Sequence, residues 1–297
     1  MALPCVSKFQ YQTHILKKMK SIISIFAVIG CFCITSCEKV HYYPDKEYKE
    51  VETLILAHHG GGTCPFQDNS IEAAIYGLTY LDGIEVDVQL SKDRTVWLSH
   101  AADLADCGGV EYDCFPVTYD KDIVKLDSCN GNTLNFTRLE TVFAYMAANY
   151  PDKYISIDVK AWSPCKITSL DITGLMNVIA EEVIKLTDKY KLHDHVMIES
   201  ETATILNFVQ KHSDGIGTYL TAFGDFERGM LITLESGYNG ISFKYKFDEE
   251  ISIKEIQLIR KKGLKIQLWT VNSEEDIKEA LSINPDFIQT DNVDYFK

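Results

Sequence analysis

Short apolar segments alternate with helix-length segments along most of the chain after residue 53. The apolar segments have the length of strands, and we expect eight of them, at residues 53–58, 83–90, 154–159, 194–199, 216–220, 239–243, 264–270 and 286–289. Helices are expected between them at 69–80, 138–149, 169–189, 201–212, 250–262 and 273–282, whereas the helix between the fifth and sixth strands gives no clear signal. Eight buried strands interleaved with helices form a parallel sheet with both faces covered. The pattern therefore predicts an α/β fold, a single-domain TIM (β/α)8 barrel.

Residues 101–136 interrupt this alternation with a long insertion after the second strand region. The insertion contains Gly108, Gly109, Pro116 and three cysteines. Loops of this length in a compact domain are usually functional or mobile. We expect the insertion to be irregular and to overhang the functional site.

Two carboxylates lie within one of the expected buried strands. Glu85 and Asp87 are two residues apart, so alternation along the strand places both on one face. At ~4 Å and an effective dielectric constant of ~20, such a pair costs roughly 4 kcal/mol, which a bound cation or a raised pKa must relieve. With Asp158 from the next expected strand, they would form an oxygen-only site for one divalent cation, Mg²⁺ or Ca²⁺.

Other polar side chains also follow expected strands. The first strand ends in His58 and His59 before three glycines, and a short apolar run at 96–98 leads to His100. Lys160 follows the third strand and Trp269 ends the seventh. The chemistry of TIM barrels lies at the C-terminal ends of the strands, which is where these residues fall.

In this order along the chain, the motifs resemble those of the glycerophosphodiester phosphodiesterase family, within the phospholipase C-like phosphodiesterases on TIM barrels. The matching segments are His58-His59-Gly60, Asp68-Asn69-Ser70 with Glu72, Glu85-Val86-Asp87, His100-Ala101, Asp158-Val159-Lys160, Trp269-Thr270-Val271-Asn272 and the final Pro285-Asp286-Phe287-Ile288-Gln289-Thr290-Asp291. The resemblance covers roughly residues 53–291. One such motif is a weak signal, whereas six in order, followed by a similar last strand, are specific.

The resemblance implies metal-dependent hydrolysis of a small phosphodiester, a glycerophosphodiester, to glycerol 3-phosphate and an alcohol. It implies acid–base catalysis by His58 and His100, without deciding which is the acid and which the base. The other implied roles are cation binding by Glu85, Asp87 and Asp158 and substrate binding by His59, Lys160 and Trp269.

Four positions depart from the family pattern. His59 stands where an arginine is expected to hold phosphate, and an imidazole lacks the bidentate fork and permanent charge of a guanidinium. Asp68 and Asp158 are each one methylene shorter than the family glutamate, and Ala101 replaces an aspartate. The resemblance therefore predicts a weaker or differently aimed phosphate site.

Three alternatives compete with this interpretation. A phosphatidylinositol-type phospholipase C-like lyase shares the barrel and the paired histidines, but often needs no metal. A non-catalytic binding lipoprotein is favoured by the departures, although it would not need both histidines and metal ligands. A barrel glycosidase would use two carboxylates without the histidine pair.

The N-terminus has the features of an exported bacterial lipoprotein. Met19-Lys20 precedes a 13-residue apolar stretch, Ile22–Ile34, which is too short to span a bilayer and has the size of a signal-peptide core. The small residues before Cys37 resemble a lipobox. We therefore expect a signal peptide at 1–36, lipidation of Cys37, a tether at 37–52 and the barrel at 53–297. The mature protein would be membrane-anchored, in the periplasm or at the cell surface.

Charge and cysteine content restrict the partners further. Removal of residues 1–36, with their four lysines, leaves 25 Lys and Arg against 43 Asp and Glu, a net charge of −18. Such an acidic surface argues against nucleic acid or anionic lipid as a partner. The five cysteines after Cys37 show no CxxC pair and no zinc-finger spacing, which argues against a zinc site built on them, and one of them must remain unpaired.

Overall fold

The computed structural model describes residues 45–46, 52–104, 114–126, 128–129, 132–133, 136–160, 171–223, 225–246 and 253–297. The expected signal peptide, Cys37 and most of the expected tether lie outside the described residues and stay predictions. The barrel lies within the compact unit Tyr43–Lys297.

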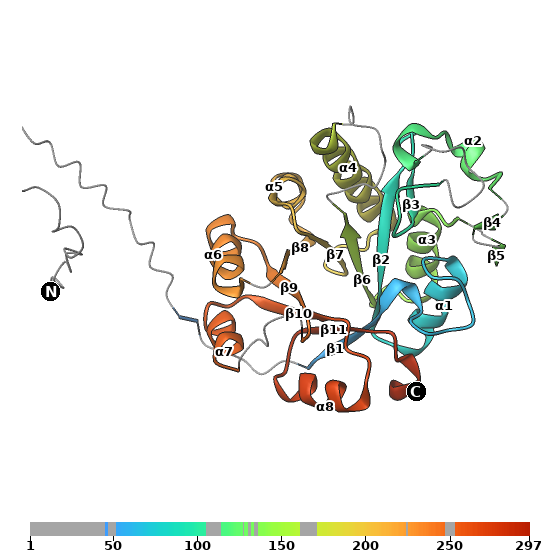
Figure 1. Ribbon diagram of the computed structural model, residues 1–297. Helices are drawn as coiled ribbons and strands as arrows, with labels where there is room; N and C mark the ends of the chain where they lie inside the picture. The colour runs from blue at the N-terminus through green and yellow to red at the C-terminus, as the bar shows by residue number, and fades with distance from the viewer. Residues whose placement is uncertain are drawn as a thin grey trace, which may run out of the picture. The chain divides into compact units, whose positions relative to one another are not determined.

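Eight parallel strands close into a barrel (Figure 1). They are β1 (Leu54–Ala57), β2 (Gly83–Leu90), β6 (Tyr154–Val159), β7 (Val196–Ser200), β8 (Ile216–Ala222), β9 (Gly240–Lys244), β10 (Lys265–Trp269) and β11 (Phe287–Thr290). Each pairs with the next in this order, and β1 pairs with both β2 and β11 to complete the ring. The predicted single-domain TIM barrel is confirmed.

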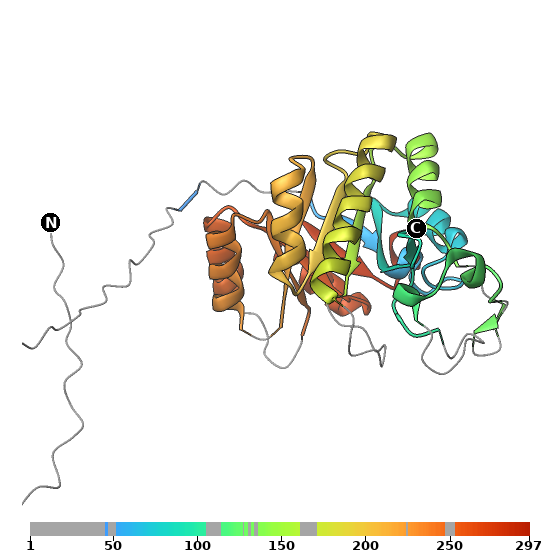
Figure 2. The same cartoon turned by 90° about the horizontal axis from the view of Figure 1, so that it is seen from above.

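Seven helices of nine or more residues cover the outside of the described ring (Figure 2). They are α1 (Ile71–Tyr80), α3 (Leu139–Asn149), α4 (Ile172–Tyr190), α5 (Ala203–His212), α6 (Phe226–Ser236), α7 (Ile253–Lys261) and α8 (Glu274–Ser282), and the chain ends in a 3-10 turn, η4 (Val293–Phe296). None of the helices in the described ranges is both long and apolar enough to cross a membrane.

Helix α6 is the one that the sequence did not predict clearly. It contains Gly229, which weakens a helical pattern. A Cβ atom at Gly229 would lie 2.9 Å from the Ala222 Cβ, so the glycine lets α6 pack closely on β8. Asp225 caps the helix through the Arg228 amide, and Gly237 ends it at a φ of 73°.

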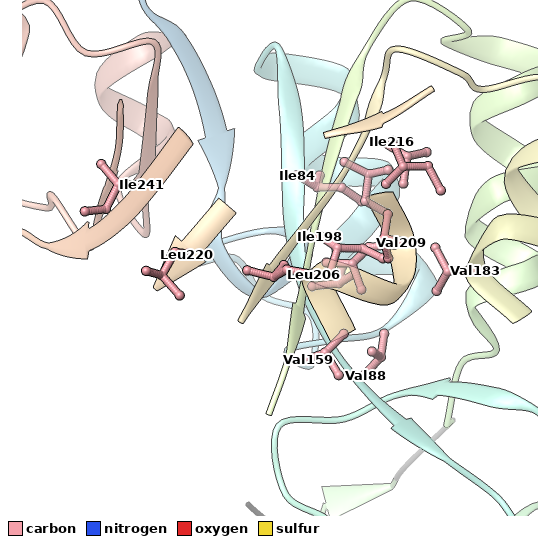
Figure 3. Close-up of a cluster of buried hydrophobic side chains, with 14 of the residues drawn as sticks. Ile84, Val88, Val159, Val183, Ile198, Leu206, Val209, Ile216, Leu220 and Ile241 are labelled. Atoms are coloured by element: carbon pink, nitrogen blue, oxygen red, sulfur yellow. The ribbon is translucent and has the colours of Figure 1, made fainter. Parts of the chain in front are cut away.

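The main hydrophobic core lies between the strands and the helices (Figure 3). Strand residues such as Ile84 and Ile198 meet Val183 of α4 and Leu206 of α5 in this layer. Because side chains alternate along each strand, the other side chains point into the barrel. Leu56, Met197, Tyr219 and Phe287 fill the interior toward the N-terminal ends of the strands. The inward positions nearer the C-terminal ends are polar, and they build the site.

The insertion is less irregular than expected. A short strand, β3 (Val96–Leu98), pairs antiparallel with the end of β2, and the described part beyond it contains η3 (Phe115–Val117), α2 (Asp120–Ile123) and a hairpin of β4 (Ser128–Cys129) and β5 (Asn132–Thr133). Trp97, Leu104, Phe115 and Ile123 form a small core of their own. The buried aromatic residues thus give the insertion a packed base, and Cys114 takes part in a disulfide.

The chain reaches the barrel at the end opposite the polar inward positions. The Lys262 Nζ lies 2.6 Å from the Asp45 Oδ1, and the Lys46 amide donates to the Lys261 carbonyl. Lys261 is the last residue of α7, and Lys262 follows it in the connection to β10. Residues 45–46 are therefore held at the N-terminal end of the strands.

Candidate active site

Three carboxylates meet inside the barrel near the C-terminal ends of β2 and β6. Alternation points Glu85 and Asp87 inward, and the parallel register places Asp158 directly beside Asp87. One oxygen of each carboxylate lies within 4.8 Å of the others. Glu85 and Asp87 are 2% and 0% exposed.

The three carboxylates differ in how their charge is compensated. Burial, reinforced by Asp87, raises the pKa of Glu85 well above its usual value. Burial also raises the pKa of Asp158 to about 7, against the opposing effect of Lys160. At Asp87 burial acts in the same direction, but Lys160 and His59 outweigh it and the pKa is lowered. The protein alone therefore leaves the cluster short of positive charge.

Lys160 is the ammonium group nearest the cluster among the described contacts. It forms an ion pair with Asp158, and its Nζ lies 3.1 Å from the Asp87 Oδ1. That Oδ1 atom is nevertheless buried without a hydrogen-bond partner among the described residues. Burial disfavours the charge on Lys160, but the two aspartates raise its pKa, so the ammonium stays charged.

His58, which follows β1, is held by a carboxylate that follows the neighbouring strand β11. Its Nδ1 lies 2.8 Å from the Asp291 Oδ1, which directly follows β11. Asn272 fixes Asp291 by donating to its Oδ2 at 2.7 Å and accepting from its amide at 2.8 Å. Burial opposes the charge on Asp291, but the bonds to His58 and Asn272 lower its pKa. Asp291 thus orients the imidazole and leaves its Nε2 facing Glu85 at 3.8 Å.

His100 reaches the mouth because β3 turns back along β2. The Val88–Leu98 register places Ser99 beside Asp87, and the Ser99 amide donates to the Asp87 carbonyl at 3.0 Å. The sequence context predicted that His100 lies at the C-terminal end of a barrel strand. Instead, it follows the short antiparallel strand β3. Burial lowers its pKa, which favours the neutral imidazole.

His59 contacts carboxylates on three sides. Its amide donates to the Glu85 Oε2 at 2.9 Å, its Nδ1 lies 3.2 Å from the Asp68 Oδ2, and its Nε2 lies 3.3 Å from the Asp87 Oδ2. Its ring stacks on His58 with centroids 3.7 Å apart. Burial acts to lower its pKa, but Asp68 and Glu85 outweigh burial and raise it.

Asn69 ties the His59 turn to β2. Its side chain donates to the Asp87 Oδ2 and accepts from the Asp87 amide, both at 3.0 Å, and its own amide donates to the His59 carbonyl at 2.8 Å. Asn69 adopts a φ of 58°, which asparagine tolerates better than most residues. Sequence reasoning included Asn69 in a motif but gave it no role, and the same holds for Asn272 and Asp291.

Trp269 lies apart from the histidines and carboxylates, at the end of β10. Its ring packs edge-on against Phe223, which follows β8, with centroids 5.9 Å apart. Phe223 is 50% exposed, so the pair forms an aromatic wall at the mouth. The structure thus brings the other predicted residues together across β1, β2 and β6 and places Trp269 on a different part of the rim.

A further carboxylate lies among the inward-facing residues. Glu199 of β7 is 3% exposed and accepts hydrogen bonds from Ser156 at 2.8 Å, Ser242 at 2.7 Å and Gln289 at 2.6 Å. All three donors are neutral, and Glu199 contributes to the raised pKa values of Glu85 and Asp158. Sequence reasoning missed this anion, whose only signal was an acid in the apolar run Val196–Ser200.

The sequence profile of the glycerophosphoryl diester phosphodiesterase family matches residues 58–295. The chain belongs to this family. It is therefore a phosphodiesterase, as the order of motifs predicted.

Individual relatives agree with the family at low identity. The chain is 25% identical to a glycerophosphodiester phosphodiesterase of Caldanaerobacter subterraneus over 246 residues, covering 81% of this chain and 95% of the relative. It is 22% identical to the lysophospholipase D GDPD1 of Rattus norvegicus over 309 residues, covering 90% and 93%. An Oleispira antarctica phosphodiesterase, solved in complex with the product sn-glycerol-3-phosphate, is similar in fold with a TM-score of 0.66 at 15% identity, covering 82% of this chain and 94% of that one.

Proposed function

We propose that the protein hydrolyses glycerophosphodiesters to glycerol 3-phosphate and an alcohol, with one divalent cation held by Glu85, Asp87 and Asp158. The observation that carries this proposal is the meeting of three carboxylates with two histidines at the mouth of the barrel. The family and the product named for the Oleispira structure support the choice of substrate.

The donor set fits a hard cation. It consists of carboxylate oxygens, and the raised pKa values of Glu85 and Asp158 reflect negative charge in need of a partner. One of these oxygens, the Asp87 Oδ1, receives no hydrogen bond from the described residues and has only the ion pair with Lys160. Six to eight oxygen ligands are usual for Ca²⁺, and Mg²⁺ combines a few carboxylates with water and phosphate oxygens. When bound, such a cation neutralises charge on the phosphate and on the transition state.

The two histidines divide the proton transfers in this proposal. His100, whose lowered pKa favours the neutral imidazole, takes the proton of the nucleophile as general base. His58, oriented by Asp291, gives a proton from Nε2 to the leaving alkoxide. Lys160 supplies positive charge to the phosphate, and Trp269 with Phe223 packs against the apolar part of the substrate.

We further propose that the chain is exported and anchored through Cys37, on the strength of the N-terminal sequence alone. Mass spectrometry of the protein purified from membranes should find a lipidated Cys37 as the first residue. An unmodified N-terminus at another position would contradict this proposal.

The function is tested by a hydrolysis assay over a panel of glycerophosphodiesters, with Mg²⁺, Ca²⁺ or a chelator, and with glycerol 3-phosphate as the readout. We expect release that depends on the cation. Accumulation of a cyclic phosphate would favour the lyase instead. If choline is released from lysophosphatidylcholine and no other diester is hydrolysed, the substrate would be a lysophospholipid. If no diester is hydrolysed, the non-catalytic binding lipoprotein would be the remaining interpretation.

A further inference from the structure

Two histidine nitrogens face the carboxylate cluster, each on a ring whose other nitrogen is held by a separate acid. The Nδ1 of His58 lies 2.8 Å from Asp291, and the Nδ1 of His59 lies 3.2 Å from Asp68. A carboxylate only accepts, so both Nδ1 atoms carry protons. The Nε2 atom of each ring faces the cluster and offers a lone pair when a metal ion displaces its proton.

Each Nε2 atom faces a carboxylate oxygen, with which it can share a metal ion in place of a proton. The His58 Nε2 lies 3.8 Å from the Glu85 Oε2, and the His59 Nε2 lies 3.3 Å from the Asp87 Oδ2. Two ligands bound tetrahedrally at ~2.0–2.1 Å are separated by about 3.3 Å, so the His58 Nε2 and the Glu85 Oε2, 3.8 Å apart, would approach by about 0.5 Å to share a cation. One nitrogen from each histidine and one oxygen of Glu85 lie within 4.8 Å of one another.

We propose that His58, His59 and Glu85 form a second cation site, which takes a transition metal such as Zn²⁺ and shares Glu85 with the oxygen-only site. Imidazole nitrogens suit zinc, whereas Mg²⁺ and Ca²⁺ prefer oxygen, so the two sites differ in chemistry. Asp291 and Asp68 supply the outer contacts that metal-binding histidines usually have.

This site has a consequence for the reaction, which rests on the proposed function. Zinc bound to the His58 Nε2 removes the atom that would protonate the leaving group. The site depends on His59, because an arginine at that position cannot act as a ligand. Zinc therefore inhibits this chain through a residue in which it departs from the family pattern.

The binding is tested by equilibrium dialysis of the full chain against Zn²⁺ in saturating Mg²⁺. The wild-type protein should bind one more zinc ion than His59→Arg. Asp68→Asn should bind this ion about 10- to 100-fold more weakly, the usual effect of losing an outer contact, and His59→Arg should lose more than that.

Two control variants separate this site from adventitious zinc binding. His193→Ala removes an exposed histidine that pairs with Asp188, and Cys64→Ser removes a free thiol. Both should keep the extra ion. Equal zinc binding by wild type and His59→Arg, or loss of the ion in either control, would overturn the site.

The inhibition is measured separately, as the zinc concentration that halves glycerol 3-phosphate release. His59→Arg should need at least roughly tenfold more zinc than wild type, and equal sensitivity would contradict the inhibitory role. If no glycerophosphodiester is hydrolysed, the proposed function fails, while the dialysis result still decides whether the site exists.

Discussion

Asp87 is the residue on which most contacts of the site converge. Asn69 donates a hydrogen bond to the Asp87 Oδ2, and the His59 Nε2 lies 3.3 Å from the same oxygen. The Lys160 Nζ lies beside the Asp87 Oδ1. This fully buried carboxylate is a proposed ligand of the cation and also a support for the side chains around it. Its neighbours would be left unpaired by its removal, which usually costs more than the contact itself contributes.

Replacing Asp87 by alanine should abolish cation binding and hydrolysis together. The cation loses a central ligand, and Lys160 loses one of its two anions. Calorimetric titration with Mg²⁺ and Ca²⁺, with the hydrolysis assay, measures both effects. Asp188→Ala, at an exposed ion pair, is the matched control, and normal cation affinity in Asp87→Ala would show that the cation binds elsewhere.

His58→Ala and His100→Ala should each lower kcat by roughly 10²- to 10⁴-fold, the usual contribution of one acid or base. Asp291→Asn should also lower kcat, by up to roughly 10⁴-fold, because asparagine no longer fixes the tautomer and orientation of His58. Asp294→Asn, at an exposed ion pair with Lys297, controls for a general effect on the C-terminal turn. Steady-state kinetics would contradict these roles if any of the first three variants kept the wild-type kcat.

At the scale of elements, the β2–β3 hairpin and β7 add what a strand-by-strand reading does not contain. The antiparallel return of β3 carries His100 back to the level of Asp87. Strand β7 contributes Glu199, an anion that is surrounded by neutral donors and acts on the cation ligands through space. Its charge favours a cation in the cluster.

Glu199→Gln keeps the size of the side chain and removes this charge. We expect cation affinity to fall roughly 10-fold, equivalent to about 1.4 kcal/mol, with the fold preserved because the serine hydroxyls can rotate to accept from the amide. Calorimetric titration with Mg²⁺ measures the affinity. Gln267→Glu makes the opposite change in charge, because it adds a second anion in the same layer, where Gln267 donates to Ser242. Unchanged affinity in Glu199→Gln would limit Glu199 to a structural role.

The sequence predicted the elements better than their long-range arrangement. Alternation and apolar content placed all eight barrel strands and the inward face of Glu85 and Asp87, because these depend on local periodicity. The Asp291 contact with His58 joins residues 233 positions apart, and the place of His100 depends on hairpin register. Neither is encoded by local pattern. The sequence signal for helix α6 was unclear because Gly229 has a low helix propensity, and the reason for a glycine there is its close packing on β8.

For the molecule as a whole, the proposed cation binding would be coupled to proton release. The carboxyl group of Asp158 has a pKa of about 7 without a cation, and that of Glu85 is also raised, so a cation must displace protons to bind. Affinity should therefore increase as pH rises from 6 to 8. Titrations in buffers of different ionisation enthalpy measure the proton release, and a pH-independent affinity with no proton release would contradict the raised pKa values.

The same shifts predict how stability depends on pH. A carboxyl group whose pKa is raised by folding destabilises the folded state as pH rises from its unfolded value, 3.8 for Asp158, through about 7. A bound cation relieves this loss. The increase in Tm on adding Mg²⁺ or Ca²⁺ should be larger at pH 8 than at pH 5, and a larger gain at pH 5 would show the opposite linkage. Thermal melts with and without cation at both pH values provide the measurement.

The contact of Asp45 and Lys46 with the loop before β10 fixes the direction from which the chain can be held. If the chain is anchored through Cys37, as proposed, the anchor joins the barrel by way of residues 45–46, at the end away from the catalytic mouth. An attachment of this kind would leave the mouth free for small diesters that diffuse in from solution.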